Sequence, residues 1–304
     1  MPRASASIAG FLIAGVLGVG AYFLPVFQVA ATSAVTSGGV TGPLAAPAQP
    51  FTVLLLGSDD DAKFAPDRYN TQSMILLRVD PNAKQATLLS IPRDLWVPIP
   101  GHGYGKISTA FQMGSSDLAV KTVETNFGVH IDDYVWIGLK GLVDLIDGIG
   151  GVDVMVTNPV MDDYYPSDIN GGDPYGYHRV AVLPGAVHLD GIHALQYVRS
   201  RHGDLRGDFA RSERQQQVLV AIKDTQLNAA DLPLLASALN GEIKTSIGLD
   251  RVQQLLAVAR QLGGPGITRV MLAPPYTTET QMADQDVVVP NWKLIQPLVH
   301  KTFP

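Results

Sequence analysis

The sequence contains no cysteine, which excludes a disulfide, a thiolate nucleophile and a zinc site with cysteine ligands. It also lacks an excess of positive charge, because the formal net charge of the 304 residues is −6. Non-specific binding to nucleic acid requires a basic surface that displaces counterions from phosphates, so nucleic acid is excluded as a partner. Any site for phosphate groups must therefore be local.

The common catalytic motifs are missing as well. There is no H-E-x-x-H zinc motif and no G-x-S-x-G nucleophile motif, and the seven histidines are scattered along the chain. The stretch Gly105–Ser108 resembles the end of a nucleotide-binding P-loop, but Pro100 stands where the first glycine of that motif belongs. A P-loop nucleotide site is therefore excluded.

A charge-free apolar run near the start is long enough to cross a membrane. It extends from Ile8 to Ala31, and at about 1.5 Å per residue a helix of this length spans a hydrocarbon core of about 30 Å. Arg3 favours a cytoplasmic N-terminus. We expect residues 1–31 to form a cytoplasmic stub and a single-pass anchor in the cell membrane, with a cleaved signal peptide as the alternative. Both interpretations place the rest of the chain outside the cytoplasm.

Residues 32–50 are rich in Ser, Thr, Gly, Ala and Pro and predict a flexible linker, which leaves residues 51–304 as one folded domain. Strand-length apolar runs in this domain alternate with helix-length patterns, which favours an α/β fold. We expect three layers, α-β-α, around a mixed central sheet. The expected strands are Phe51–Leu56, Ser73–Val79, Ala86–Ile91, Val152–Val156, Tyr197–Arg201 and Thr268–Ala273. The expected helices are Ser115–Asn126, Leu139–Ile149, Arg211–Gln226, Leu232–Leu239 and Asp250–Leu262.

The main positive signal is a cluster of five arginines between residues 199 and 214 of this acidic chain. The guanidinium fork is charged at neutral pH and matches phosphate oxygens with two parallel hydrogen bonds. We expect Arg199 and Arg201 to share one face of a strand, and Asp208, Arg211 and Gln215 to share one face of a helix. Side chains that converge in this way suit a diphosphate.

An alternative interpretation makes the cluster an ordinary solvated surface. Arg206 and Arg214 would then form surface ion pairs with Asp204 and Glu213, and Asp208 would only cap a helix. We favour this interpretation for Arg206 and Arg214 alone.

Polar residues also follow two expected strands, and ligands of layered α/β proteins bind beyond the carboxyl ends of strands. Asp59 follows the first strand, although a single acid in that place often serves only as a turn former. Arg93 and Asp94 follow Pro92, which keeps the preceding residue extended and helps to hold Arg93 at the rim of the sheet.

At these positions the sequence resembles the LytR-CpsA-Psr family. The resemblance rests on the motifs LLLGSD (Leu54–Asp59), SIPRD (Ser90–Asp94), KIS (Lys106–Ser108) and the arginine-rich run Arg199–Gln216, and it covers roughly residues 51–226. It implies a phosphotransferase that moves a glycopolymer from a polyprenyl pyrophosphate carrier to peptidoglycan, with the lipid tail in an apolar tunnel under the sheet. It also implies a divalent cation, Mg²⁺ or Mn²⁺.

The resemblance assigns roles residue by residue. The residues that it implies for pyrophosphate binding are Arg93, Lys106, Arg199, Arg201, Arg211 and Gln215, and those implied for catalysis are Arg93, Asp94, Asp208 and Arg211. Asp94 or Asp208 would accept the proton or orient an arginine. A lysine in the place of Lys106 is otherwise more often a surface residue.

The sequence departs from the family at the metal. Asp59 matches the family's metal-binding acid, but Asn70 and Gln72 stand where the family has R-x-D, so the second carboxylate is missing. Gln72 offers a neutral oxygen, and Asp67 or Arg68 could compensate. A cation held by one carboxylate would bind more weakly and rely on substrate phosphates.

The aspartate-rich insert Met161–His178 does not have the spacing of a calcium loop. We expect an exposed loop near the mouth of the site, whose tyrosines could stack on sugar rings. The expected partners are a polyprenyl-pyrophosphate-linked glycan, peptidoglycan and the lipid bilayer. Two functions are alternatives to transfer, namely a non-catalytic polyprenyl phosphate carrier or sensor and a polyprenyl pyrophosphate hydrolase.

Overall fold

The structure, a computed structural model, describes residues 49–58, 69–167, 173, 175–201, 207–225, 242–247, 266–282 and 284–304. The predicted anchor lies outside these ranges, as do Asp59 and the expected helices Leu232–Leu239 and Asp250–Leu262. Within them, no helix combines the length and the apolar character needed to span a bilayer.

A mixed six-stranded sheet forms the centre of the molecule, in the order β11-β6-β1-β2-β3-β12. The six strands are β11 (Ile243–Thr245), β6 (Asp133–Ile137), β1 (Phe51–Ser58), β2 (Thr71–Asp80), β3 (Gln85–Ser90) and β12 (Ile267–Met271). Strand β1 runs antiparallel to β2 and parallel to β6, while β12 runs parallel to β3. The predicted mixed central sheet is therefore confirmed.

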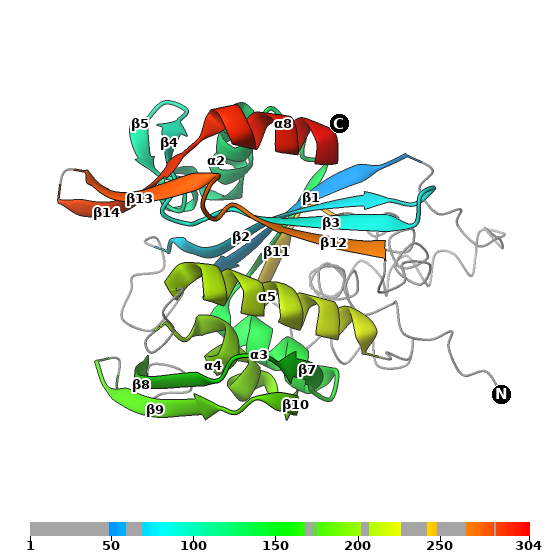
Figure 1. The fold of residues 1–304 in the computed structure, drawn as a ribbon, viewed down its shortest axis with the longest axis vertical. Coiled ribbons are helices and arrows are strands. Elements are labelled where there is room, and N and C mark those ends of the chain that lie inside the picture. Colours follow the sequence, from blue (N-terminus) through cyan, green and yellow to red (C-terminus); the bar gives the residue numbers. More distant parts are fainter. Residues whose placement is uncertain are drawn as a thin grey trace, which may run out of the picture.

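Helices cover both faces of the sheet (Figure 1). On one face lie α3 (Leu139–Gly148), α4 (Gly191–Arg199) and α5 (Gly207–Asp224). On the other face lie α2 (Thr109–Phe127) and α8 (Trp292–Thr302). Because side chains alternate along a strand, the continuous apolar runs of β1 and β2 supply both cores. Val53 packs into the core between the sheet and helices α3, α4 and α5, and Leu54 packs into the core between the sheet and helices α2 and α8.

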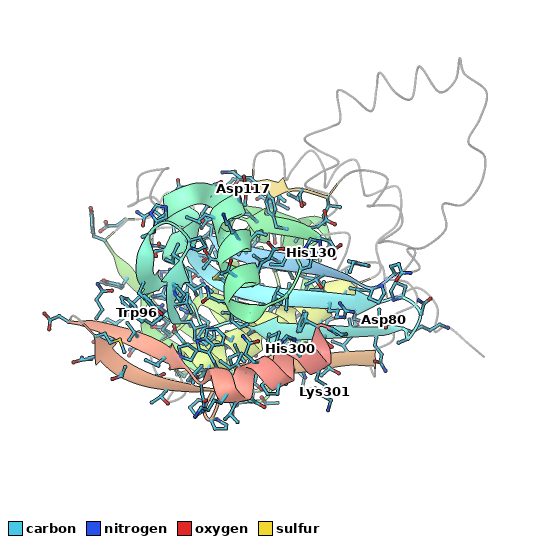
Figure 2. All side chains as sticks on the ribbon, turned by 90° about the horizontal axis from the view of Figure 1, so that it is seen from above. Asp80, Trp96, Asp117, His130, His300 and Lys301 are labelled. Carbon is cyan, nitrogen blue, oxygen red and sulfur yellow. The ribbon has the colours of Figure 1, made fainter. Side chains whose placement is uncertain are left out.

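In the part of the chain that the structure describes, four two-stranded ladders accompany the central sheet: β4 (Trp96–Ile99) with β5 (Gly103–Lys106), β7 (Val152–Val156) with β10 (Gly185–Leu189), β8 (Val160–Pro166) with β9 (Tyr177–Val182), and β13 (Thr277–Met282) with β14 (Gln285–Pro290). The view from above shows the last pair beside α8 and reaching beyond it (Figure 2). This hairpin is attached to the segment after β3, because Leu95 forms a parallel bridge with Val288.

Two expectations about local structure are wrong. The run Tyr197–Arg201 is not a strand, because α4 continues to Arg199. Asp190 caps this helix by accepting a hydrogen bond from the His193 N–H. Residues that recur at helical spacing are buried along one face, and their burial stabilises the helix. The insert Met161–His178 is not simply a loop, because β8 and β9 pair as an antiparallel ladder at its two ends.

Candidate functional site

Arg93 lies just beyond the end of β3 and contacts three polar side chains of the site. Its Nη1 donates a hydrogen bond to Oε1 of Gln72, and its Nε lies 3.3 Å from Oδ2 of Asp94. The same Nε lies 3.6 Å from Oδ2 of Asp208 at the start of α5. Arg93 therefore connects the strand ends of β2 and β3 to the first turn of α5.

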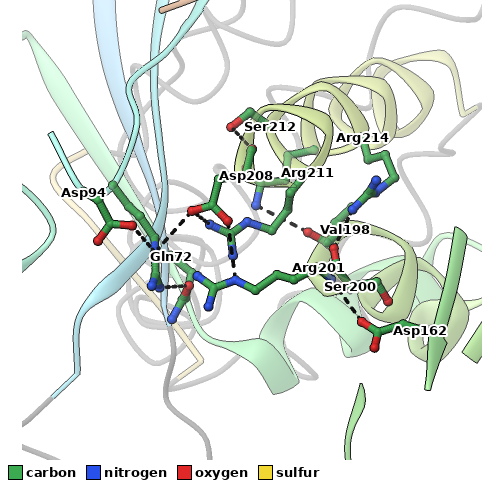
Figure 3. A network of polar contacts seen from close by, with 12 residues as sticks. Gln72, Asp94, Asp162, Val198, Ser200, Arg201, Asp208, Arg211, Ser212 and Arg214 are labelled. Atoms are coloured by element: carbon green, nitrogen blue, oxygen red, sulfur yellow. Dashed lines mark hydrogen bonds and ion pairs between the residues drawn. The ribbon is translucent and has the colours of Figure 1, made fainter. Parts of the chain in front are cut away.

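The Asp208 carboxylate lies near guanidinium groups from three segments of the chain (Figure 3). Its carboxylate lies 2.9 Å from Arg211 Nη2, 3.5 Å from Arg201 Nε and 3.6 Å from Arg93 Nε. The first turn of a helix also favours a negative charge, which explains an aspartate at this position. Asp94 and Asp208 are two carboxylates beside three guanidinium groups and the Lys106 ammonium group, so the cluster keeps an excess of positive charge.

Arg211 is the most buried member of this cluster, with a side chain that is 5% exposed. Its Nε is buried and has no hydrogen-bond partner among the residues that the structure describes. Burial lowers the pKa of Arg211 to about 9, with Asp208 opposing the shift and Arg201 and Arg93 adding to it. Burial likewise lowers the pKa of Arg201. The missing hydrogen bond of Arg211 and the lowered pKa values of Arg201 and Arg211 indicate a cationic site that a bound anion would stabilise.

Asp94 is held between two cations. Lys106, at the end of β5, lies 2.9 Å from one carboxylate oxygen, and Arg93 lies near the other. Burial raises the pKa of Asp94, but Arg93 and Lys106 together lower it further than burial raises it, so the net pKa lies below the usual value. Asp94 is therefore ionised, and it links the predicted site residue Lys106 to the arginines.

Arg199 and Gln215 lie at the inner side of the cluster. The Arg199 guanidinium lies 5.8 Å from the centre of the Tyr165 ring, and Gln215 Nε2 donates to the carbonyl of Val198 at 3.5 Å. Arg199 belongs to the last turn of α4, so Arg199 and Arg201 do not share a strand face as expected. Both Arg199 and Gln215 still line a cavity of this region.

Arg214 is not the surface residue that its sequence suggested. It is 5% exposed, its Nε donates to the Tyr197 carbonyl at 2.7 Å, and its Nη2 donates to the Ser200 carbonyl at 2.5 Å. Arg214 thus joins the end of α4 to α5 and lies apart from the pair Arg201 and Arg211, as Figure 3 shows. The expected exclusion of Arg214 from the site agrees with this geometry, but the expected surface position is wrong, because the side chain is buried. Arg206 lies outside the described residues.

Two cavities meet at the arginine cluster. The first is apolar, lies between the sheet and helices α3, α4 and α5, and has a volume of about 160 Å³. The second is polar, has a volume of about 480 Å³, and is lined by Arg93, Asp94 and Asp208 among others. Four residues line both cavities: Gln72, Ser73, Arg211 and Gln215. A ligand that joins an apolar chain to a polar group through phosphates would match this arrangement.

The sequence motifs did not reveal the outer wall of the polar cavity. Glu279, Gln281 and Asp286 of the hairpin β13–β14 form part of it, although they follow the motif region by more than fifty residues. No spacing in the sequence links them to the arginines. The only signal was their polarity within short extended segments.

The described residues do not by themselves fit a magnesium site. The Gln72 oxygen already accepts a hydrogen bond from Arg93, and Asp94 and Asp208 each face cationic side chains. Among the described residues there is no group of three His, Asp or Glu side chains that could hold a metal ion. Asp59, on which the metal prediction chiefly rests, lies outside them.

The β8–β9 hairpin adjoins the site, which agrees with the expected place of the insert near its mouth. Asp162 Oδ2 accepts a hydrogen bond from the Arg201 N–H at 3.0 Å, and the Tyr165 ring lies beneath Arg199. Tyr164 and Tyr177 are exposed and form an edge-to-face pair with ring centres 6.2 Å apart. Stacking of these tyrosines on sugar rings stays a prediction.

Comparison with known sequences finds relatives that match about two thirds of this chain or more. The teichoic acid transferase TagU of Enterococcus faecalis, named a polyisoprenyl-teichoic acid–peptidoglycan transferase, is 34% identical over 213 residues, which cover 68% of this chain and 65% of the relative. The corresponding TagV of Bacillus subtilis is 34% identical over 222 residues, which cover 71% of this chain and 54% of TagV. The chain thus spans between about half and two thirds of the length of these relatives.

Solved structures show the same fold. The crystal structure of B. subtilis TagV matches with a TM-score of 0.68 and 26% identity, covering 84% of this chain and 98% of TagV. TagT with bound octaprenyl pyrophosphate matches with a TM-score of 0.63 and 27% identity, covering 88% of this chain and 93% of TagT. The sequence profile of the LytR_cpsA_psr family matches residues 29–289. With the profile extending over most of its length, the chain belongs to the LytR-CpsA-Psr family.

Proposed function

We propose that this chain is a phosphotransferase that moves a glycopolymer from a polyprenyl pyrophosphate carrier to peptidoglycan. The observation that carries the proposal is the junction of an apolar and a polar cavity at the buried, incompletely paired Arg211. A lipid-linked pyrophosphate has its charges at the same kind of junction, between a hydrocarbon tail and a glycan. The names of the relatives, which act on teichoic acid and peptidoglycan, support the same activity.

The tail would occupy the apolar cavity. Its walls come from alternate residues of the sheet and from three helices, with Leu139 of α3, Leu195 of α4 and Val218 of α5 as examples. The cavity volume of about 160 Å³ is small for a long prenyl chain, so α3, α4 and α5 would move outward when the lipid binds. The bound octaprenyl pyrophosphate of TagT supports a lipid of this class.

The pyrophosphate would bind at the junction of the two cavities. Arg201 and Arg211 pair with Asp208 in this structure, and Arg93 lies between Asp94 and Asp208. Incoming phosphate oxygens would replace Asp208 as a partner of the three arginines. Arg199 and Gln215 would add contacts from the apolar side, where both line the cavity. Fixed guanidinium groups aimed at the phosphates stabilise the charge that develops during phosphoryl transfer.

The reaction is a substitution at the phosphorus nearer the glycan. An acceptor hydroxyl oxygen of peptidoglycan forms a bond to this phosphorus while the bond to the bridging oxygen breaks. Polyprenyl phosphate leaves with the electron pair, and the glycan becomes joined to the acceptor through a phosphodiester. The hydroxyl proton passes to a carboxylate of the site.

Asp208 is the better proton acceptor of the two candidates. Phosphates would take over its arginine partners and so release its carboxylate within the polar cavity. Asp94 would keep Lys106 at 2.9 Å, and its lowered pKa makes it a weak base. We assign Asp94 to the positioning of Arg93 and Lys106.

A divalent cation, Mg²⁺ or Mn²⁺, is part of the proposal only through Asp59. When bound, such an ion would neutralise phosphate charge. The described residues do not complete its ligand set, so the steps above use the side chains alone. We also propose that residues 1–31 anchor the chain in the cell membrane with the domain outside the cytoplasm, which membrane fractionation and protease accessibility of the full chain would test.

The direct test is transfer by the purified full chain in detergent. A polyprenyl-pyrophosphate-linked glycan and peptidoglycan should yield polymer-bearing peptidoglycan and polyprenyl phosphate in equal amounts. Arg199→Ala should weaken donor binding, because Arg199 lines the cavity below the pyrophosphate site. Donor binding without turnover would identify a carrier or sensor instead, and equal product release without acceptor would identify a hydrolase.

A further inference from the structure

The hairpin β13–β14 forms part of the wall of the polar cavity, which arginines also line. Glu279, Gln281 and Asp286 line this cavity together with Arg93 and Arg211. In the antiparallel register Gln281 pairs with Asp286, and Glu279 stands two residues before Gln281 on the same face. The three polar side chains therefore form one surface, to which the proposed pyrophosphate contacts assign no role.

This surface is fixed relative to the site. The Val288 N–H donates a hydrogen bond to the carbonyl of Asp94 at 2.9 Å, and Leu95 forms a bridge with Val288. At the base of the hairpin, Thr277 Oγ1 donates to the Leu272 carbonyl at 2.9 Å. The hairpin is thus joined through the backbone to the segment that carries Arg93 and Asp94.

The chemistry of the surface differs from that of the arginine side. Gln281 Nε2 donates to Asp286 Oδ1 at 3.0 Å, which leaves the other oxygen of Asp286 and the oxygen of Gln281 as acceptors. Two carboxylates repel phosphate, whereas carboxylate and amide oxygens accept hydrogen bonds from hydroxyl groups. The surface therefore suits an uncharged, hydroxyl-rich group.

The direction of the reaction decides which hydroxyl-rich group binds there. In an in-line substitution the attacking oxygen lies opposite the leaving oxygen. The leaving oxygen belongs to the lipid phosphate, whose tail lies in the apolar cavity, and the polar cavity lies beyond the shared residues Arg211 and Gln215. The attacking hydroxyl must therefore enter through the polar cavity.

We infer that the β13–β14 hairpin binds the acceptor sugar of peptidoglycan and presents its hydroxyl to the pyrophosphate, with Glu279, Gln281 and Asp286 accepting hydrogen bonds from the sugar. The inference rests on the proposed function, since the acceptor is defined by that reaction. The Nε of Arg211, which lines the same cavity, is buried and has no hydrogen-bond partner among the described residues, and this gives the cavity a second mark of a ligand site.

The test compares a double variant, Glu279→Ala with Asp286→Asn, with the unchanged full chain. The double variant should raise the KM for acceptor at least tenfold, while the donor Kd stays within twofold. Affinity for a soluble tetrasaccharide fragment of the peptidoglycan glycan strand should fall to a similar degree. Asp284→Asn is the matched control, because this substitution removes a carboxylate from the hairpin at a position outside the cavity lining. Asparagine also tolerates the positive φ of 60° at position 284.

The outcomes separate this inference from the proposed function. Absence of transfer by the unchanged chain overturns the proposed function, and tetrasaccharide binding then still decides whether the hairpin holds a glycan. Transfer with an unaltered acceptor KM and unaltered tetrasaccharide affinity in the double variant overturns the inference. A parallel loss of donor affinity also overturns it, because the hairpin would then act on the donor.

Discussion

Arg211 combines deep burial with incomplete pairing, a combination that disfavours folding and favours ligand binding. Its only described ion-pair partner is Asp208, which it shares with Arg93 and Arg201. Moving the Arg211 charge from water into the protein interior costs free energy, and attraction to a carboxylate shared with other arginines does not fully offset this cost. Binding sites commonly retain such costs because the ligand completes the pairing.

Arg211→Met should therefore separate stability from affinity. We expect the free energy of unfolding without ligand to stay unchanged or to rise by about 1 kcal/mol, since Asp208 keeps two arginine partners. Affinity for polyprenyl pyrophosphate should fall by about 2 kcal/mol or more, roughly 30-fold. Chemical denaturation and calorimetric titration measure the two quantities. A loss of stability with intact affinity would show that Arg211 is structural.

The lowered pKa of Arg211 also predicts how donor binding depends on pH. Burial holds the pKa near 9 in the free protein, and a bound anion would raise it. The protonated form binds better, so the Kd should be constant up to about pH 8 and should rise as the pH increases through 9, by at most tenfold per unit. Fluorescence titration between pH 7 and pH 10.5 measures this profile. Arg211→Met should give a flat profile, and a flat profile in the unchanged chain would contradict the prediction.

Gln72 offers a way to test the metal prediction. A carboxylate at this position would restore the acid that the family pattern has there, although its neighbour Arg93 would compete for it. Gln72→Asp should therefore produce or strengthen Mg²⁺ binding, measured by calorimetry without substrate, if Asp59 is a ligand. Gln72→Asn is the control, because it keeps a neutral oxygen. Equal heats for both variants would mean that no metal site forms beside Gln72.

Arg214 is one of the residues that join helix α5 to the end of helix α4. Its guanidinium donates to the carbonyls of Tyr197 and Ser200, where α4 ends, and its carbon chain is buried. This contact holds the segment that carries Arg199 and Arg201. Two arginines three residues apart on one helix therefore have different roles, with Arg211 directed to the ligand and Arg214 to the backbone.

Arg214→Met should lower the free energy of unfolding by about 2–4 kcal/mol, because two buried carbonyls lose their donors. Thermal and denaturant unfolding measure the loss. Arg179→Met is the matched control, since Arg179 forms an exposed ion pair with Asp163, and such pairs contribute at most about 1 kcal/mol. Similar small losses in both variants would contradict the structural role of Arg214.

The strands of the central sheet could be predicted from the sequence because their apolar runs are buried on both faces. The runs beginning at Phe51, Ser73 and Ala86 correspond to β1, β2 and β3. Alternating arginines misled the prediction at Tyr197–Arg201, since R-x-R fits a strand face as well as a helix end. The cap at Asp190 and the contacts of Arg214 decide this segment, and both depend on residues outside the run.

The site was predictable where a motif marks it and unpredictable where only tertiary contact does. The residues that the structure brings together as the resemblance implied are Arg93, Asp94, Lys106, Arg201, Asp208 and Arg211. The hairpin β13–β14 reaches the same cavity through its bridge to Leu95, and no local pattern predicts such a contact. Specificity for the acceptor would therefore lie in a segment that the motifs do not cover.

The molecule as a whole encloses an apolar cavity between two of its layers, the sheet and helices α3, α4 and α5. A polyprenyl tail in this site would contact both layers and so stabilise their packing. Burial of each CH₂ group contributes about 0.8 kcal/mol before the cost of moving the helices. Donor affinity should therefore increase with tail length until the cavity is filled.

Leu219→Trp should remove this dependence on tail length. Leu219 lines the cavity eight residues after Arg211 on α5, about 12 Å along the helix axis, which is beyond the reach of a ten-carbon tail. The variant should bind geranyl pyrophosphate as the unchanged chain does, but it should lose the additional affinity for octaprenyl pyrophosphate. Calorimetric titration with both lipids measures the difference, and Leu183→Trp, at a position 66% exposed and outside the cavity, controls for the added indole. Equal affinity of the unchanged chain for the two lipids would show that the tail binds elsewhere.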